Sequence, residues 1–340
     1  MPHLPAFSEF AALAREAQLV PVYRRLTADT LTPVSAFQKI DGGDCGGLFE
    51  SVVGGEKVGR YSFLTASPFM RLLAYGRRVI VEKDGQRNEF EADDPLGELE
   101  SRIKSFRAAT LPGLPPFCGG AIGYAGYDTV RYVERLPNAP TDDRALPDLA
   151  FAFFDQMVVF DNVNKTVTVL AMARIDRHQD NVRAAYDEAC RRVDELVARL
   201  SRPDVGLQPA DIGAGELPRI DFESNCTQQE YEAAVERSQE YIRAGDIFQV
   251  VLSQRLRTKF DCPPFELYRS LRVVNPSPFM FYLRMPEVTL VGSSPEIMVR
   301  VVDGVVTNRP LAGTRPRGAT DEEDRRLAEE LLADPKERAE

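Results

Sequence analysis

Residues 308–318, N-R-P-L-A-G-T-R-P-R-G, lead into an acidic segment that ends in D-P-K-E-R-A-E at residues 334–340. Asp334 is a suitable cap for a helix that begins with the proline after it. On that helix Glu337 and Glu340 are spaced i and i+3, so their carboxylates lie on one face. Such a pair predicts half of a Mg²⁺ site, because Mg²⁺ prefers oxygen ligands. The alternative interpretation is a solvated helix face.

Composition and charge exclude several classes of function. The 340 residues are 44% hydrophobic and 28% charged, with a formal net charge of -10 and a pI of about 5.0. This balance leaves no basic surface for nucleic acid. The five cysteines are scattered without C-x-x-C spacing, which favours reduced thiols over disulfides or zinc. No apolar run reaches the length of a membrane span and no signal-peptide pattern is present, so we expect a cytoplasmic protein without a membrane partner.

The first 200 residues predict α+β structure built on antiparallel hairpins. Asp84-Gly85 is a typical hairpin turn. The glycine-rich run 117–128 lacks the spacing of a phosphate loop and fits a strand against which another backbone or an aromatic ring packs closely. Further strands are expected at 48–53, 70–75, 151–160 and 166–171, and helices at 8–16, 95–106 and 176–200.

Residues 201–218 are rich in Pro, Gly and Asp and are predicted to link two domains, 1–200 and 219–340. Thr227 and Glu230 form a capping box for the first helix of the second domain. Its other elements are expected to be strands at 246–254 and 288–302, and helices at 264–273 and 321–333. A last helix of about one and a half turns is marginal alone, so we expect a chain truncated at its C-terminus.

Few side chains are candidates for chemistry, because the sequence has two histidines and neither a G-x-S-x-G nor an H-E-x-x-H motif. Glu296 follows a proline that interrupts a strand, and it either points into a cavity or is a solvated edge residue. Gln249 lies in an apolar strand pattern as either a structural amide or a substrate contact. Thr314 follows Gly313, and its hydroxyl and neighbouring N–H are suitable carboxylate donors.

Taken in order, seven motifs closely resemble the anthranilate synthase component I family of chorismate-utilising enzymes, over nearly the whole chain. The motifs are L-F-E-S-V-V-G-G-E-K-V-G-R-Y-S-F (48–63), G-G-A-I-G-Y-A-G-Y-D (119–128), G-D-I-F-Q-V-V-L-S-Q (245–254), N-P-S-P-F-M (275–280), G-S-S-P-E (292–296), R-P-L-A-G-T-R-P-R-G (309–318) and D-P-K-E-R-A-E (334–340). The resemblance implies the fold of this family, with antiparallel sheets flanked by helices.

Relatives that add water to chorismate carry a lysine where this chain has Gln249. Some aminodeoxychorismate synthases carry a covalent lysine at the position of Ala312. Both positions therefore favour anthranilate synthase.

The resemblance also implies roles for individual residues. Gly313 and Thr314 would bind chorismate, and Glu296 would be the general acid that protonates the departing C4 hydroxyl. Gln249 would line the path of the nucleophile. Glu337 and Glu340 would bind the Mg²⁺ ion that neutralises the substrate carboxylate.

A second set of residues resembles the tryptophan feedback site of the family: Glu50, Ser51, Pro278, Phe279 and Met280. The family often has tyrosine where this chain has Phe279, which loses a hydroxyl and keeps the ring.

The implied reaction converts chorismate and ammonia to anthranilate and pyruvate, the first step of tryptophan biosynthesis. A glutamine amidotransferase subunit would supply the ammonia, and tryptophan would inhibit. Because the family has a further C-terminal part with more ligands, we expect a chain of these 340 residues alone to be inactive. The alternatives are aminodeoxychorismate synthase component I and a non-catalytic tryptophan-binding fragment.

Overall fold

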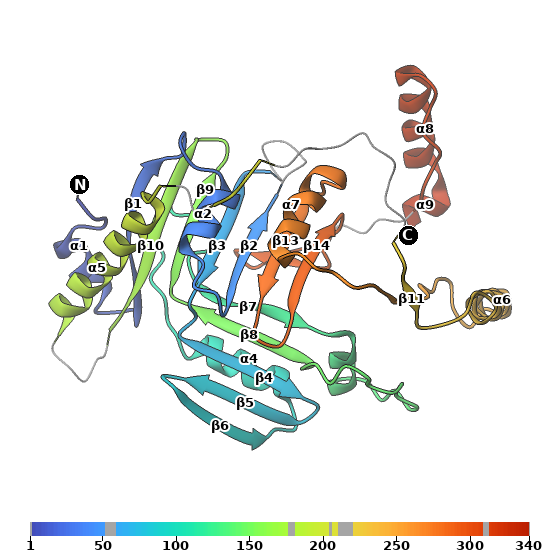
Figure 1. Ribbon diagram of the computed structural model, residues 1–340, viewed down its shortest axis with the longest axis horizontal. Helices are drawn as coiled ribbons and strands as arrows, with labels where there is room; N and C mark the ends of the chain where they lie inside the picture. The colour runs from blue at the N-terminus through green and yellow to red at the C-terminus, as the bar shows by residue number, and fades with distance from the viewer. Residues whose placement is uncertain are drawn as a thin grey trace. The chain divides into compact units, whose positions relative to one another are not determined.

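Two antiparallel sheets dominate the structure, a computed structural model that describes residues 2–51, 59–175, 181–203, 206–209, 220–308 and 313–339. The seven-stranded sheet has the order β1-β10-β9-β3-β2-β13-β14, and the five-stranded sheet has the order β6-β5-β4-β8-β7 (Figure 1). Pairing is antiparallel throughout both sheets. This arrangement confirms the predicted α+β class with antiparallel sheets flanked by helices.

The bounds of the elements are as follows. The strands are β1 Leu19–Thr27, β2 Gly46–Glu50, β3 Tyr61–Ala66, β4 Met70–Tyr75, β5 Arg78–Lys83, β6 Gln86–Glu91, β7 Gly120–Ala125, β8 Leu149–Phe154, β9 Gln156–Asp161, β10 Thr166–Arg174, β11 Glu223–Ser224, β12 Leu256–Arg257, β13 Phe279–Arg284, β14 Thr289–Ser294, β15 Arg300–Val302 and β16 Val305–Thr307. The helices are α1 Phe7–Leu13, α2 Pro33–Ile40, α4 Pro95–Lys104, α5 Val182–Leu200, α6 Gln228–Ala244, α7 Pro264–Val274, α8 Asp321–Ala333 and α9 Pro335–Ala339, with a 3₁₀ helix η1 at Tyr127–Tyr132.

The alternation of side chains along the strands builds separate apolar layers. On β9, Val158 packs with α2, α5 and α7 on one face of the seven-stranded sheet, while Met157 and Val159 belong to a cluster on the other face. On β4, Leu72 packs with α4, while Leu73 joins Leu283 of β13 in a shared cluster. The two sheets therefore share apolar contacts, and helices cover their outer faces.

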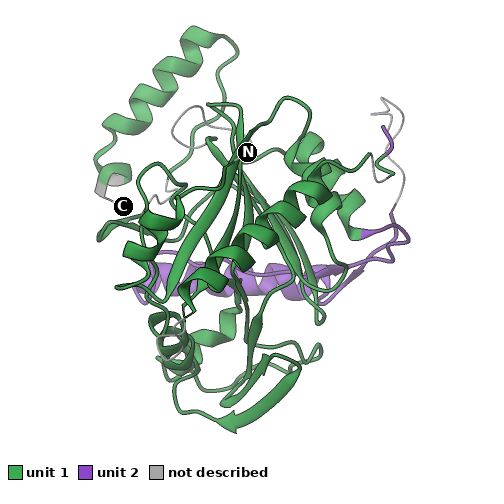
Figure 2. Ribbon diagram, turned by 90° about the vertical axis from the view of Figure 1, so that its left-hand side faces the viewer, with its two compact units in different colours: residues 1–207, 264–340 green, residues 208–263 purple. Residues whose placement is uncertain are grey.

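The chain forms two compact units, residues 1–207 with 264–340, and residues 208–263 (Figure 2). Strand β13 pairs with β2 from Met280 opposite Glu50 to Arg284 opposite Gly46. Residues 279–294 thus belong to the same sheet as the first 200 residues, a grouping that differs from the predicted division at 201–218. Part of this predicted linker lies outside the described residues.

Local signals predicted many helix ends and turns. The capping box of α6 and the cap of α8 are present, with the Thr227 side chain accepting from Glu230 N and the Thr320 side chain accepting from Glu323 N. The hairpin turn of β5 and β6 has positive φ at Asp84 and Gly85, as the sequence predicts. The predicted helix at 176–200 begins at Val182, and residues 176–180 lie outside the described residues.

One strand prediction was wrong, and two were right except that each strand is interrupted. The predicted strand 246–254 is irregular, with Phe248 85% exposed and Val251 84% exposed, because among the described residues no neighbouring strand takes up its backbone hydrogen bonds. The strand expected at 151–160 breaks at Asp155, and the strand expected at 288–302 breaks after Ser294, where Pro295 cannot donate a ladder hydrogen bond. Helix α2 and strand β3 were not predicted.

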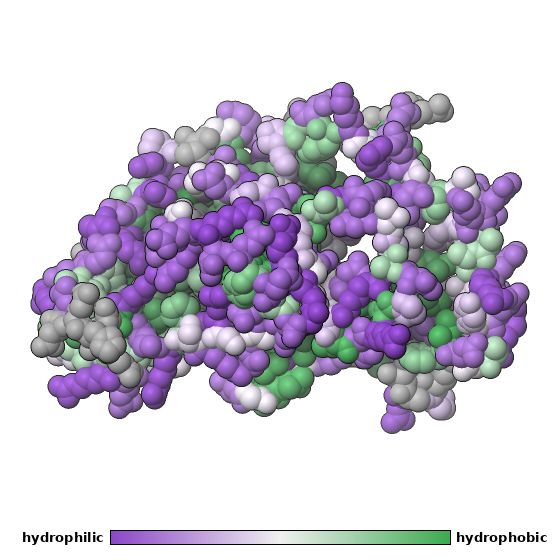
Figure 3. Space-filling model, turned by 90° about the horizontal axis from the view of Figure 1, so that it is seen from below, coloured by the Kyte–Doolittle hydropathy of each residue, from purple (hydrophilic) through white to green (hydrophobic). Residues whose placement is uncertain are grey.

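None of the described helices combines the length and the apolar character needed to cross a membrane. Hydrophilic residues cover much of the face shown in Figure 3, interrupted by apolar patches. All five cysteines are free, as their spacing predicts.

Candidate functional site

The structure brings four of the predicted effector residues together at the junction of β2 and β13. Glu50 and Met280 are register partners on the two strands. The Ser51 hydroxyl donates a hydrogen bond of 2.8 Å to the Pro278 carbonyl oxygen, and Met280 is buried. Phe279 pairs with Ser294 of β14 on the other side of β13. Residues that are more than 200 positions apart in the sequence therefore meet at one place because of the β2–β13 ladder.

The carboxylate of Glu50 is held by two side chains from α7. Its Oε2 accepts a hydrogen bond of 2.6 Å from the Tyr268 hydroxyl, and its Oε1 accepts one of 3.0 Å from Nη2 of Arg272. Arg272 Nε also lies 2.7 Å from Oε2. Glu50 is only 6% exposed, so this charge is buried with a paired cation.

Burial raises the pKa of the Tyr268 hydroxyl far above its usual value, and the Glu50 charge raises this pKa further. Tyr268 is therefore a permanent hydrogen-bond donor at neutral pH. The sequence analysis missed Tyr268 and Arg272. Their i, i+4 spacing on the predicted helix 264–273 places them on one face and was the available signal.

The predicted chorismate-binding turn lies against a predicted metal ligand. A Cβ atom placed on Gly313 would meet Glu337 Oε2 at 1.7 Å, so only glycine allows this close approach of the carboxylate. Arg315, which the sequence analysis did not single out, reaches the same acidic group. Its Nη2 donates a hydrogen bond of 2.9 Å to Asp334 Oδ2, and its Nη1 lies 3.5 Å from Glu337 Oε1. Thr314 is exposed on this turn.

Only part of the predicted Mg²⁺ site falls within the described residues. Glu337 offers carboxylate oxygens of the kind that Mg²⁺ prefers, beside the Gly313 backbone. Its partner Glu340 lies outside the described residues. In the described part of the chain, no cluster of three or more His, Cys, Asp or Glu side chains could hold a metal ion.

Glu296, the predicted general acid, lies on an exposed bend after β14. Its backbone N–H donates to the Ser294 hydroxyl at 3.4 Å, and its carbonyl accepts from the same hydroxyl at 3.0 Å. The serine thus fixes the turn that follows the strand. The exposed position differs from a cavity-facing side chain, and the catalytic role of Glu296 stays a prediction.

Gln249 belongs to the second compact unit, residues 208–263, and is exposed in an irregular segment of it. Its expected place in a strand is therefore wrong. Its predicted role beside the nucleophile stays a prediction.

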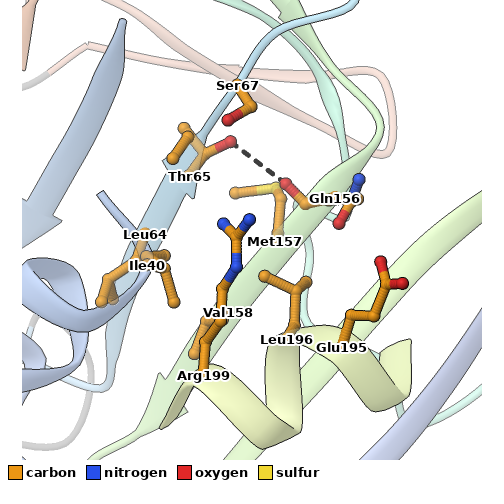
Figure 4. Close-up of a pocket in the computed structure, with 11 residues that line it drawn as sticks. Ile40, Leu64, Thr65, Ser67, Gln156, Met157, Val158, Glu195, Leu196 and Arg199 are labelled. Carbon is orange, nitrogen blue, oxygen red and sulfur yellow. Dashed lines mark hydrogen bonds between the residues drawn. The ribbon is translucent and has the colours of Figure 1, made fainter. Parts of the chain in front are cut away.

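A cavity of about 100 Å³ lies between α5 and strands β3 and β9 (Figure 4). Thr65 Oγ1 donates a hydrogen bond of 3.1 Å to the Gln156 carbonyl at its edge, and Glu195 and Arg199 reach it from α5. Its floor is apolar, from Ile40, Leu64 and Val158. The predicted site residues do not line this cavity, so it is separate from the sites above.

Comparison with known proteins gives consistent matches. The family described as chorismate binding enzyme matches residues 59–340. Anthranilate synthase component 1 of Acetivibrio thermocellus is 39% identical over 342 residues, covering 99% of this chain and 68% of that protein. Anthranilate synthase component 1 of Synechocystis is 42% identical over 356 residues, with coverage of 99% and 68%.

A solved structure supports the same relationship. The crystal structure of anthranilate synthase component I from Streptococcus pneumoniae matches with a TM-score of 0.66 and 29% identity, covering 93% of this chain and 65% of that one. The chain thus spans about two thirds of the length of the relatives it matches. On these grounds the chain belongs to the chorismate binding enzyme family, alongside proteins named anthranilate synthase component 1.

Proposed function

We propose that the chain is part of an anthranilate synthase large subunit, which converts chorismate and ammonia to anthranilate and pyruvate in tryptophan biosynthesis. The observation that carries this proposal is 39% and 42% identity to two anthranilate synthase component 1 proteins over 99% of the chain. Gln249 stands where water-adding relatives carry lysine, which favours ammonia as the nucleophile. Ala312 stands where some aminodeoxychorismate synthases carry a covalent lysine, which favours anthranilate synthase.

In the proposed reaction, this chain's own residues bind chorismate and move one proton. Gly313 and Thr314 bind a substrate carboxylate through backbone N–H groups and a hydroxyl. Glu296 donates the proton that the C4 hydroxyl needs to leave as water. Gln249 lines the approach of ammonia to C2. Elimination of the enolpyruvyl group then gives the aromatic product.

Mg²⁺ is proposed as the cofactor, held by Glu337 and Glu340. When bound, it would neutralise a carboxylate of the substrate. The close packing of Glu337 on Gly313 supports this arrangement, because it puts a carboxylate ligand next to the proposed substrate-binding turn.

We further propose that tryptophan binds at Glu50, Ser51, Pro278, Phe279 and Met280 and inhibits the enzyme. The convergence of Glu50, Ser51 and Pro278 at one strand junction supports a shared ligand site. A glutamine amidotransferase subunit is the proposed source of ammonia, and the cytoplasm is the proposed location.

The test of the activity uses the gene product read from its start codon to its stop codon. With chorismate, Mg²⁺ and ammonium it is expected to release anthranilate, followed by its fluorescence, and pyruvate in equal amounts. A product that keeps the enolpyruvyl group would instead favour aminodeoxychorismate synthase. The absence of any aminated product would contradict the proposal.

A protein limited to residues 1–340 is predicted to form no anthranilate in the same assay, because it spans about two thirds of its relatives. The second candidate function, a tryptophan-binding module, is favoured by the same effector junction. Calorimetry with tryptophan on this protein, compared with Ser51→Ala, tests it, and no heat from the parent protein would count against it.

A further inference from the structure

The carboxylate of Glu50 and the segment that carries Pro278 and Met280 are joined through one helix. Helix α7 supplies Tyr268 and Arg272 to Glu50, and its C-terminal end leads within four residues to Pro278. From this geometry we propose that Tyr268 and Arg272 are positioning residues, which hold the Glu50 carboxylate in place and aim it at the ammonium group of an amino-acid effector. The inference rests on the proposed tryptophan site.

Burial makes such support necessary. Glu50 is 6% exposed, and a buried carboxylate needs a cation and hydrogen-bond donors to replace the water that it has lost. Arg272 supplies the compensating charge at 2.7 Å and 3.0 Å from the two oxygens.

The hydrogen bonds leave room for a ligand. An ionised carboxylate has about four acceptor positions. Oε2 of Glu50 is contacted by the Tyr268 hydroxyl and by Arg272 Nε, and Oε1 accepts a hydrogen bond from Arg272 Nη2. Acceptor capacity for an ammonium group therefore remains on Oε1, while the two α7 side chains fix the rotation of the carboxylate.

The donors themselves are held rigidly. Tyr268 is fully buried, and the centroid of its ring lies 5.9 Å from that of Phe265 and 6.0 Å from that of Tyr282. Helix α7 packs on β13 and β14 (Figure 1). A movement of α7 would thus displace the Glu50 carboxylate and the 275–280 segment together, and this coupling ties effector affinity to the position of one helix.

The experiment is calorimetry of tryptophan binding to the parent protein and four variants. Tyr268→Phe keeps the ring and removes one hydrogen bond to a charged group, and it is expected to weaken binding about tenfold. Arg272→Gln is expected to weaken binding by more than tenfold, and Arg272→Lys, which restores the charge at one point, by less than Arg272→Gln. Arg191→Gln is the control for loss of an arginine charge, because Arg191 of α5 pairs with Glu188 at 2.6 Å on the exposed surface, and its affinity should stay within about twofold of the parent.

Rescue by the conservative variant separates positioning from a purely structural role. Arg272→Lys keeps a cation beside Glu50 and loses the planar fork of donors. If Arg272 positions the carboxylate through its charge, Arg272→Lys should recover part of the affinity that Arg272→Gln loses. A change in packing alone would lower the affinity of both variants equally.

The possible results separate the two proposals. If the parent protein gives no heat with tryptophan, the proposed effector site fails and this inference fails with it. If the parent binds but Tyr268→Phe and Arg272→Gln bind equally well, or Arg272→Lys binds no better than a weakened Arg272→Gln, the inference is overturned and the effector site stands. Near-ultraviolet circular dichroism checks each fold, and if Arg272→Gln is unfolded, the isosteric Tyr268→Phe decides.

Discussion

Asp155 lies between β8 and β9, and its buried carboxylate forms ion pairs with two arginines. It is 5% exposed and lies between Arg174, at 2.8 Å, and Arg192 of α5. Arg174 also stacks over the ring of Phe69 at 3.7 Å. The predicted strand 151–160 thus breaks at Asp155, the residue that pairs with arginines of both β10 and α5.

Replacing Asp155 by Asn should lower the free energy of unfolding by about 3 kcal/mol, because it leaves two guanidinium groups with no counter-charge at this point. Urea denaturation measures the change. Asp187→Asn is the matched control, because Asp187 lies 3.0 Å from Arg183 in an exposed ion pair. This change should lower the free energy of unfolding by less than about 0.5 kcal/mol. Equal effects of the two variants would contradict this account.

The buried thiol of Cys45 should lower the free energy of unfolding at alkaline pH. Burial raises the pKa of its thiol from 9.0 to about 11, although the nearby Arg71 lowers it in part. The unfolded chain releases this proton at lower pH than the folded chain. The contribution of the protonated Cys45 thiol to the free energy of unfolding is therefore complete below pH 9. Up to about 2–3 kcal/mol of it is lost between pH 9 and 11.

The free energy of unfolding, measured by urea denaturation across this pH range, should decline less for Cys45→Ala than for the parent protein. Cys262→Ala, at an exposed thiol, should keep the decline of the parent. A Cys45→Ala profile parallel to that of the parent would exclude Cys45 as the cause.

At the scale of elements, the pairing of β7 with β8 depends on one glycine. A Cβ atom on Gly123 would meet the Ala150 carbonyl oxygen at 2.0 Å and Phe151 Cα at 2.6 Å, both of which belong to the backbone. This finding confirms the interpretation of the run 117–128 as a strand with close backbone approach.

Gly123→Ala should therefore destabilise the protein by about 2–3 kcal/mol, since β8 must shift to admit the methyl group. Gly126→Ala is the control. Its Cβ would meet the Asp148 carbonyl oxygen at 3.4 Å without a positive φ, and it should change the unfolding free energy by less than about 1 kcal/mol. Thermal denaturation that ranks Gly126→Ala as the more harmful change would refute the argument.

Elements with local signals were predictable from the sequence, and elements fixed by distant partners were not. The caps at Thr227 and Thr320 and the turn at Asp84-Gly85 depend on neighbours within three residues. The β2–β13 ladder has no local signal, because periodicity does not tell which strand will be its neighbour. The effector residues were identified by family resemblance, whereas Tyr268 and Arg272 emerged only from the folded geometry.

At the scale of the whole molecule, the long helices α5 and α6 differ in how well buried apolar contacts anchor them. None of the residues of α6 is buried, whereas α5 buries Ala189, Val193, Leu196 and Leu200. Buried apolar contacts, more than helix propensity, stabilise helices in proteins. The described part of residues 208–263 therefore has little local stability of its own.

Native-state hydrogen exchange should detect this difference. The opening free energies of amides in α6 are expected to lie at least about 2 kcal/mol below those of the central strands β9 and β10. Thr227→Ala should lower the protection of α6 further, because it removes the capping box. Equal protection of α6 and the sheet would show that the unit is anchored as firmly as the rest.

The β2–β13 ladder also has a consequence for synthesis on the ribosome. Ser51 and Pro278 are separated by 227 positions, so one edge of β2 stays unpaired while all the intervening residues are translated. At about 5–20 residues per second, this interval lasts roughly 10–45 s. An open strand edge invites pairing with other chains during that time, which makes the nascent polypeptide a natural client for chaperones until β13 emerges.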